Sequence, residues 1–345
     1  MNDEPKITTA ADHGLTATSQ VYLRDWGDFG GTCLVGACRV SPDLFMPGAR
    51  VLGLEKAGSY LLGTWRTEDG AMHRFLRVLG AYDTNMGCSV FSTRNADRLS
   101  RLGEDKAPVF RGGLRTTCDG QHVRIASPDG CGFRHAIDVR SSSWDEGDLL
   151  SCSGELIAPA TQWYNPWRTG GGGYAITAKF RGKATVFGQP AEGFFAHESH
   201  FFPAGANFMA SPYGFGGREI HWGHMATVFE DGSVIDASLA YGPDGWGFAL
   251  LTDEQGRFYA TNEIEIGANV RPSGYPELIT YRFLNQTWCW RIDPKGERDD
   301  TAPGGMIGAE GVLTRSGETR RVVGSMGTID WWKDGREKAV PPAFV

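Results

Sequence analysis

Apolar and polar residues alternate along short stretches of this chain. Residues 179–184, for example, read KFRGKA. A period of two sends successive side chains to opposite faces of a β-strand, one against a core and the other toward solvent. Helical periodicity is weak, and its best candidate is a short turn over residues 93–102. The pattern therefore predicts an all-β protein.

Turn signals separate the alternating stretches. Asp-Gly pairs stand at 69–70, 119–120, 129–130, 231–232 and 244–245, each between apolar runs. Such pairs favour tight hairpins because both residues tolerate positive φ. Glycine is also abundant, at 48 of 345 residues, which is about twice the usual share. Antiparallel hairpins in this number predict a barrel or a sandwich.

The chain divides into an arm and two domains in this interpretation. Residues 1–20 are polar and predict a loose N-terminal arm. Residues 203–217 are rich in glycine and proline and lack alternation. We therefore place a junction near residue 205, between one domain at 21–204 and another at 205–345, both of ordinary size.

Charge and composition exclude several classes of protein. The net charge is −7 without a basic run, which disfavours a nucleic-acid partner. No apolar stretch approaches the length of a membrane span, and residues 2–6, NDEPK, do not resemble a secretory leader. The seven cysteines are scattered and form no CxxC pair. Free thiols in a reducing cytoplasm are the simplest interpretation.

Four of the eight histidines stand in two short segments, FAHESHF at 195–201 and EIHWGH at 219–224. On a strand, residues three apart face opposite ways, so His197 and His200 cannot chelate together, nor can His221 and His224. The sequence thus predicts no metal site within either segment. A metal-dependent alternative remains, in which one histidine from each segment meets Glu198 across strands.

The pairs that share a face in the first segment are His197 with Ser199 and Glu198 with His200. A carboxylate or imidazole inside an apolar barrel is desolvated, which moves its pKa toward neutrality and suits it to proton transfer. Glu198 and His197 are therefore rival candidates for an interior acid or base. The alternative is that these side chains only hydrogen-bond backbone at the seam between the halves.

Aromatic residues supply candidate substrate contacts. Residues 163–167 read WYNPW, where Trp163 and Trp167 are candidate walls of a ligand site and the Tyr164 hydroxyl a polar handle. Trp222 and Tyr241 are further substrate-binding candidates, beside His200. Core packing is the commoner role of any single tryptophan.

Two tryptophans and one glutamate in the second half of the chain also have expected positions. Trp288 and Trp290 share one face of a strand and are expected in a core. Glu310 follows an apolar stretch at 307–309, so it is either exposed or buried with a partner. We include Glu310 among the substrate-binding candidates.

Nucleotide cofactors and serine-hydrolase chemistry are disfavoured by the motifs. The glycines at 170–173 are followed by Tyr174 and Ala175 and do not precede a helical pattern. No P-loop and no GxSxG stand anywhere in the sequence. We expect no cofactor.

Several short motifs resemble those of a known family. The stretch VFGQPAEGFFAHES at 186–199 resembles a glycine followed by Asp-His-Glu-Trp in tandem-lipocalin proteins. WYNP at 163–166, before this stretch, and YPELITY at 275–281, AEGV at 309–312 and VGSMG at 323–327, after it, resemble other strands of the same proteins, in the same order. These proteins form the carotenoid hydratase (hydroxyneurosporene synthase)-like superfamily, with kievitone hydratase and decalin-forming Diels–Alderases as relatives.

The resemblance covers about residues 155–335 and departs from the family at two positions. Ala196 stands where the motif has aspartate, and Ser199 stands where it has tryptophan. The positions that the resemblance carries over are the histidine and glutamate of the motif together with a tyrosine and a second glutamate: His197, Glu198, Tyr164 and Glu310.

The resemblance and the turn pattern together predict two lipocalin-like antiparallel β-barrels packed side by side. The implied function is a cofactor-independent lyase or isomerase that hydrates, dehydrates or cyclises a hydrophobic isoprenoid, steroid or polyketide-like molecule. Glu198, His197 or His224 would act as acid or base inside an apolar cavity. The alternative is a non-catalytic carrier of a hydrophobic ligand, which the replaced motif residues favour.

Overall fold

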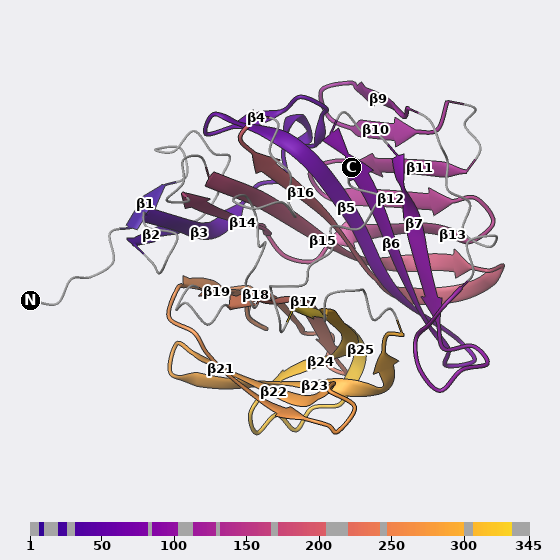
Figure 1. Ribbon diagram of the computed structural model, residues 1–345, viewed down its shortest axis with the longest axis vertical. Helices are drawn as coiled ribbons and strands as arrows, with labels where there is room; N and C mark the ends of the chain where they lie inside the picture. The colour runs from indigo at the N-terminus through magenta and orange to yellow at the C-terminus, as the bar shows by residue number, and fades with distance from the viewer. Residues whose placement is uncertain are drawn as a thin grey trace, which may run out of the picture.

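A computed structural model shows the fold of the chain (Figure 1) and describes residues 7–9, 20–25, 32–81, 85–102, 113–128, 132–166, 172–204, 220–241, 247–299 and 306–332. These residues are almost entirely β-strand, with one short 3-10 helix, η2 (Pro42–Phe45). The helix candidate at 93–102 is wrong: this segment is a turn followed by the two-residue strand β8. The predicted all-β class is confirmed.

The described part of the chain up to residue 202 forms one curled antiparallel sheet. Its main path runs β8-β7-β6-β5-β16-β15-β13-β12-β11-β10-β9, and β14 joins β15 to β3. Residues 7–9 of the expected loose arm pair with β2. The strands are β1 (Ile7–Thr9), β2 (Gln20–Asp25), β3 (Thr32–Cys38), β4 (Arg50–Val51), β5 (Leu54–Thr67), β6 (Met72–Gly80), β7 (Asn85–Ser92), β8 (Ser100–Arg101), β9 (Arg115–Cys118), β10 (Val123–Ala126), β11 (Phe133–Ile137), β12 (Ser141–Glu146), β13 (Leu150–Leu156), β14 (Ala160–Pro166), β15 (Gly172–Val186) and β16 (Gln189–Phe202).

A second curled antiparallel sheet contains the described residues from 220 onward. Its order is β20-β19-β18-β17-β25-β24-β23-β22-β21. The predicted junction near residue 205 falls at 205–219, outside the described residues. The strands are β17 (Ile220–Phe229), β18 (Val234–Tyr241), β19 (Gly247–Thr252), β20 (Phe258–Thr261), β21 (Glu265–Val270), β22 (Pro276–Phe283), β23 (Gln286–Glu297), β24 (Met306–Arg315) and β25 (Val322–Trp332).

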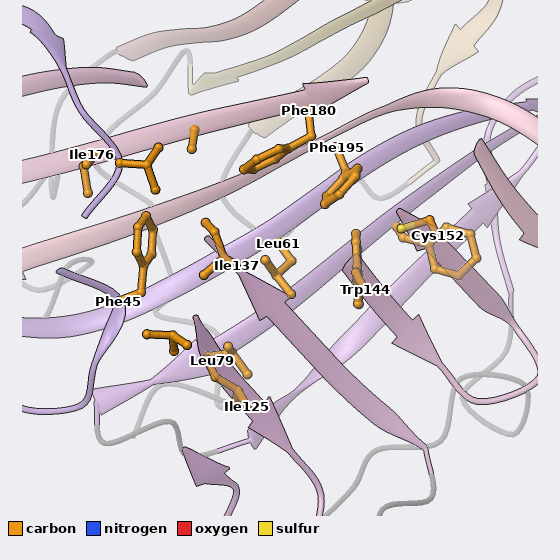
Figure 2. Packing of buried hydrophobic residues seen from close by; sticks show 14 of the residues in the cluster. Phe45, Leu61, Leu79, Ile125, Ile137, Trp144, Cys152, Ile176, Phe180 and Phe195 are labelled. Carbon is orange, nitrogen blue, oxygen red and sulfur yellow. The ribbon is translucent and has the colours of Figure 1, made fainter. Parts of the chain in front are cut away.

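Each sheet curls into a half-barrel around its own core, as two lipocalin-like barrels require (Figure 1). In the first core, Leu61, Trp144 and Phe195 are fully buried and lie together (Figure 2). In the second core, Trp288 and Trp290 are fully buried, which confirms their expected position. The predicted fold class of two antiparallel β-barrels is therefore confirmed.

The Asp-Gly pairs at 69–70, 119–120 and 231–232 form the predicted turns, whereas those at 129–130 and 244–245 lie outside the described residues. Gly70 links β5 to β6 with φ of 78°, and Gly232 links β17 to β18 with φ of 83°. Glycine adopts these angles without the clash that a Cβ would cause. Tight turns here set the register of two long hairpins that flank the space between the sheets.

The two sheets also contact one another through a small apolar layer. Phe194 and Ala196 of β16 pack with Ala226 and Val228 of β17 and with Met326 of β25. Because side chains alternate along a strand, other residues of β16 and β17 with the same parity also face this layer. The side chains between the sheets thus form a layer that is distinct from both cores.

Two further observations bear on the sequence predictions. In the described part of the chain, no helix is long and apolar enough to cross a membrane. Five cysteines have described side chains, and all five are free thiols: Cys38, Cys88, Cys118, Cys152 and Cys289.

Candidate functional site

A buried carboxylate lies between two imidazoles in the layer that separates the sheets. Glu198 Oε1 on β16 lies 2.5 Å from Nε2 of His200, and Oε2 lies 2.5 Å from Nε2 of His224 on β17. The Thr177 hydroxyl of β15 donates to Oε2 over 3.0 Å. The three side chains Glu198, His200 and His224 therefore form one hydrogen-bonded unit, which we call the Glu198 cluster.

The cluster is nearly inaccessible to water. Glu198, His200 and His224 are 5%, 2% and 3% exposed. Burial alone would raise the pKa of Glu198, but the charges and hydrogen bonds of His224 and His200 hold it well below its usual range. The sequence analysis expected burial to move this pKa toward neutrality, and that expectation is wrong because it did not include the second imidazole. Glu198 is the anion of the cluster.

The His224 ring has a second neighbour at the same nitrogen. The Trp222 indole N–H lies 2.9 Å from His224 Nε2, and the Ser238 hydroxyl lies 3.5 Å from Nδ1. Nε2 has either one proton or one lone pair. A protonated Nε2 donates to Glu198, whereas a bare Nε2 accepts from Trp222. Glu198 and Trp222 therefore both approach the same nitrogen, and Nδ1 has only the longer contact with Ser238.

Aromatic rings pack together next to His224 of the Glu198 cluster. Trp163 on β14, Trp222 on β17 and Phe248 on β19 pack mutually, with centroids 5.6 to 6.0 Å apart. Trp163 and Phe248 are buried, whereas Trp222 is partly exposed. Two of the predicted walls, Trp163 and Trp222, thus meet beside His224. The third, Trp167, lies outside the described residues.

Tyr60 of β5 approaches the other imidazole. Its ring meets His200 edge-on with centroids 5.3 Å apart. Burial and the nearby Glu198 charge raise the pKa of Tyr60, so its phenol stays protonated. Sequence reasoning did not identify Tyr60, Thr177 or Phe248, because none stands in a motif and each reaches the site from a different strand.

His197, the rival interior candidate, faces the first core and does not join the cluster. Its Nδ1 lies 2.9 Å from Nε2 of His135, whose own Nδ1 donates to the Ser143 carbonyl over 2.8 Å. Its Nε2 lies 3.3 Å from the hydroxyl of Ser199, which contacts Ser59. Burial lowers the pKa of His197 well below its usual value and that of His135 to about 4. Both rings are therefore neutral, and they lie in the first core, outside the Glu198 cluster.

The structure places the two rival acid–base candidates, Glu198 and His197, on opposite faces of β16. Phe195 and His197 point into the first barrel, while Glu198 points out of it toward the second sheet. The predicted pairs that share a face, His197 with Ser199 and Glu198 with His200, are confirmed. Periodicity correctly separated the two faces, but the titratable cluster lies between the barrels and not in an apolar barrel cavity.

Three other candidates do not touch the Glu198 cluster. Tyr164 is half-buried against the first core, on the face of β14 opposite to Trp163, and burial raises its pKa. Tyr241 lines a pocket in the second half-barrel. Glu310 is buried in the layer between the sheets.

Glu310 forms an ion pair that is separate from the Glu198 cluster. Arg74 Nε of β6 lies 3.1 Å from Glu310 Oε1, and the hydroxyls of Thr328 and Thr64 donate to its carboxylate over 2.6 and 3.1 Å. Of the two expected states, the exposed one is wrong, and the buried one with a partner is the one that the structure shows. These contacts occupy its carboxylate oxygens, so Glu310 holds the two sheets together.

The described side chains of this cluster are not arranged as a metal site. One histidine from each segment does meet Glu198, as the metal alternative required. Each Nε2, however, lies in direct hydrogen-bond contact with a carboxylate oxygen. Among the described residues, no group of three or more His, Cys, Asp or Glu side chains is placed to hold a metal ion.

Comparisons with known proteins give structural likenesses only. No family model and no curated protein matches this sequence. Similar solved structures include a protein assigned as ATTH from Nitrosomonas europaea, with 16% identity over 81% of this chain and 92% of that chain and a TM-score of 0.45. Kievitone hydratase from Nectria haematococca shares 9% identity over 93% and 98%, with a TM-score of 0.43. CghA with Sch210972 shares 9% over 88% and 94%, with a TM-score of 0.47.

Proposed function

We propose that this protein is a lyase or isomerase of the hydratase, dehydratase or cyclase type, which acts on a hydrophobic small molecule by acid–base chemistry. The observation that carries the proposal is the Glu198 cluster, in which one buried carboxylate contacts imidazoles from both sheets at 2.5 Å. Perturbed titratable groups beside an aromatic wall are typical of catalytic sites. Chemistry of this kind needs no cofactor.

The residue with the most suitable position for proton transfer is His224. Glu198 stays ionised and stabilises the imidazolium, as a carboxylate does when it orients a catalytic histidine. The sequence analysis proposed Glu198 itself as acid or base; we now assign it the role of a positioning residue and electrostatic partner.

A dehydration illustrates how the cluster would act. While Nε2–H of the His224 imidazolium stays on Glu198, its Nδ1 gives a proton to a tertiary hydroxyl, and water leaves with the C–O electron pair. The faces of Trp163 and Trp222 stabilise the resulting carbocation. The neutral imidazole then removes the adjacent proton, which forms the alkene and restores the imidazolium. The reverse sequence is hydration, and capture of the cation by a second double bond is cyclisation.

The substitution Glu198→Gln tests the proposal because it keeps size and hydrogen bonding but removes the charge. Turnover of tertiary terpene alcohols and of the matching alkenes should fall by about a hundredfold to ten-thousandfold. The Kd for the substrate should change little, because the loss concerns the transition state. Glu192→Gln, an exposed position on the same strand, is the matched control and should retain full activity.

The competing function is a non-catalytic carrier. It is favoured by the burial of the whole cluster at 5% exposure or less, which is also expected of a purely structural ion pair. Tight binding of these compounds without turnover would establish the carrier. A Glu198→Gln protein that melts many degrees lower but keeps its activity per folded molecule would show that the cluster is structural.

A further inference from the structure

The second half-barrel contains a pocket that is separate from the Glu198 cluster. Its volume is about 280 Å³, close to the lower end of the ~300–1,000 Å³ typical of small-molecule sites. It lies between β21, which is at one edge of the sheet, and the middle strands β17 and β25. The residues that line it are His221, Tyr241, Ile266, Gly267, Ala268, Val270 and Trp331.

One buried polar atom of this lining has no partner. His221 is 1% exposed, and its Nε2 lies 2.6 Å from the hydroxyl of Tyr281 in the second core. Its Nδ1 has no hydrogen-bond partner among the described residues. A buried nitrogen left unsatisfied costs about 1–3 kcal/mol, and a molecule in the pocket that hydrogen-bonds this atom would remove that cost.

The tautomer of His221 follows from its neighbour. Burial lowers the pKa of His221 to about 3 and raises that of Tyr281 well above its usual value, so both side chains are neutral. The contact with His221 is the one hydrogen bond that the described residues give the Tyr281 hydroxyl. The hydroxyl proton needs an acceptor, and His221 Nε2 is the one within reach, so the hydroxyl donates to Nε2. The histidine proton then stands on Nδ1. The unsatisfied atom is therefore an N–H donor that requires an acceptor.

The remaining lining defines the class of ligand. Ile266, Ala268 and Val270 are apolar, and Val270 is 46% exposed at the rim. Trp331 meets the His221 ring edge-on with centroids 5.7 Å apart. None of the seven lining residues is a carboxylate, a lysine or an arginine. A charged ligand would lose its hydration without an opposite charge to replace it.

We propose that this pocket is a second ligand site, which binds an uncharged and largely apolar molecule whose carbonyl oxygen accepts a hydrogen bond from His221 Nδ1–H. The site is independent of the proposed acid–base function, because residues 221 and 224 of β17 have opposite parity. His221 contacts Tyr281 in the second core, whereas His224 contacts Glu198 between the sheets. Tyr241, a substrate-binding candidate from the sequence, belongs to this second site.

A matched pair of probes tests the proposal by calorimetry on the full chain. 2-Acetylnaphthalene has the carbonyl, and 2-isopropenylnaphthalene has the same shape with a CH₂ in place of the oxygen. The acetyl compound should bind about twofold to tenfold more tightly, the range expected of one net hydrogen bond. His221→Phe keeps an aromatic ring and should abolish this preference.

A second variant locates the probe and does not depend on the folding of His221→Phe. Ala268→Phe fills the pocket from β21 and should weaken both probes at least tenfold. Gly113→Ala, which meets nothing within 4 Å and lies outside the pocket lining, is the control and should leave both affinities unchanged. Equal affinities of the two probes for the unaltered protein would overturn the proposal. Absence of binding, or binding that Ala268→Phe does not weaken, would overturn it equally.

Discussion

Glu198 Oε2 on β16 lies 2.5 Å from His224 Nε2 on β17, and this contact joins the two sheets across their shared layer. Neither half-barrel contains the complete cluster. His200 and Thr177 complete it from the first sheet, and Trp222 and Ser238 complete it from the second. The candidate site therefore exists only when the sheets are packed together.

The first prediction concerns whether Glu198 and His224 act together in one step. Glu198→Gln and His224→Gln should each lower turnover by about a hundredfold or more. The double variant should be no slower than the slower single variant, because residues that act as one unit are not additive. Turnover measurements on the four proteins check this. Effects that multiply in the double variant would mean that the two residues act in separate steps.

The second prediction concerns a buried ion pair in the same layer. Lys179 Nζ of β15 lies 2.8 Å from Asp236 Oδ1 of β18, and the two side chains are 2% and 4% exposed. Lys179→Met leaves a buried carboxylate unpaired and should cost about 3–5 kcal/mol of unfolding free energy in urea. The double variant Lys179→Met, Asp236→Leu should recover most of that loss.

A surface pair gives the control for this comparison. Arg124 and Asp119 lie 2.8 Å apart with side chains 53% and 48% exposed. Arg124→Gln should change the unfolding free energy by less than about 1 kcal/mol. If Lys179→Met costs no more than Arg124→Gln, the layer between the sheets is accessible to water in solution.

The third prediction concerns stability as a function of pH. Burial lowers the pKa of His73 and of His135 to about 4 and that of His221 to about 3. These rings bind protons in the unfolded chain near pH 6.5 but stay neutral in the folded one. The unfolded state thus binds more protons below pH 6.5, so the unfolding free energy should be highest above that pH and fall as pH decreases toward 4.

Urea unfolding at several pH values measures this slope. His135→Asn removes one such ring and should reduce the slope by up to about 1.4 kcal/mol per pH unit. The control His122→Gln alters a side chain that is 39% exposed and should leave the slope unchanged. Below about pH 4.5 a further loss is expected, because Glu198 takes up a proton in the unfolded chain while it stays ionised in the folded one. A stability that is constant from pH 7 to 4 would contradict the burial of these histidines.

The fourth prediction concerns metal. Zinc lies about 2.0–2.2 Å from each of its nitrogen and oxygen ligands, and a carboxylate oxygen already occupies that space at each imidazole of the cluster. Elemental analysis of purified protein should find no stoichiometric zinc, iron or copper, and a chelator should not change the melting temperature. One metal per chain that is lost in His224→Ala would revive the metal-dependent alternative.

Local sequence rules determined the strands, their turns and the two faces of each strand. The Asp-Gly pairs at 69–70 and 231–232 form hairpins with glycine at positive φ. The period of two correctly placed Glu198 with His200, and it separated His221 from His224. These features follow from backbone geometry within a few residues, so no knowledge of distant segments was required.

Only the tertiary structure decided which face of each strand meets which neighbour. The same period of two that paired Glu198 with His200 could not tell whether this face enters a barrel or leaves it. His224 lies 26 positions further along the chain, and Thr177, Tyr60 and Phe248 come from three other strands. Their approach depends on how two separately curled sheets bury their apolar surface, a long-range balance that leaves no local pattern. For the same reason the low pKa of Glu198 was missed: it depends on an imidazole that the other sheet supplies.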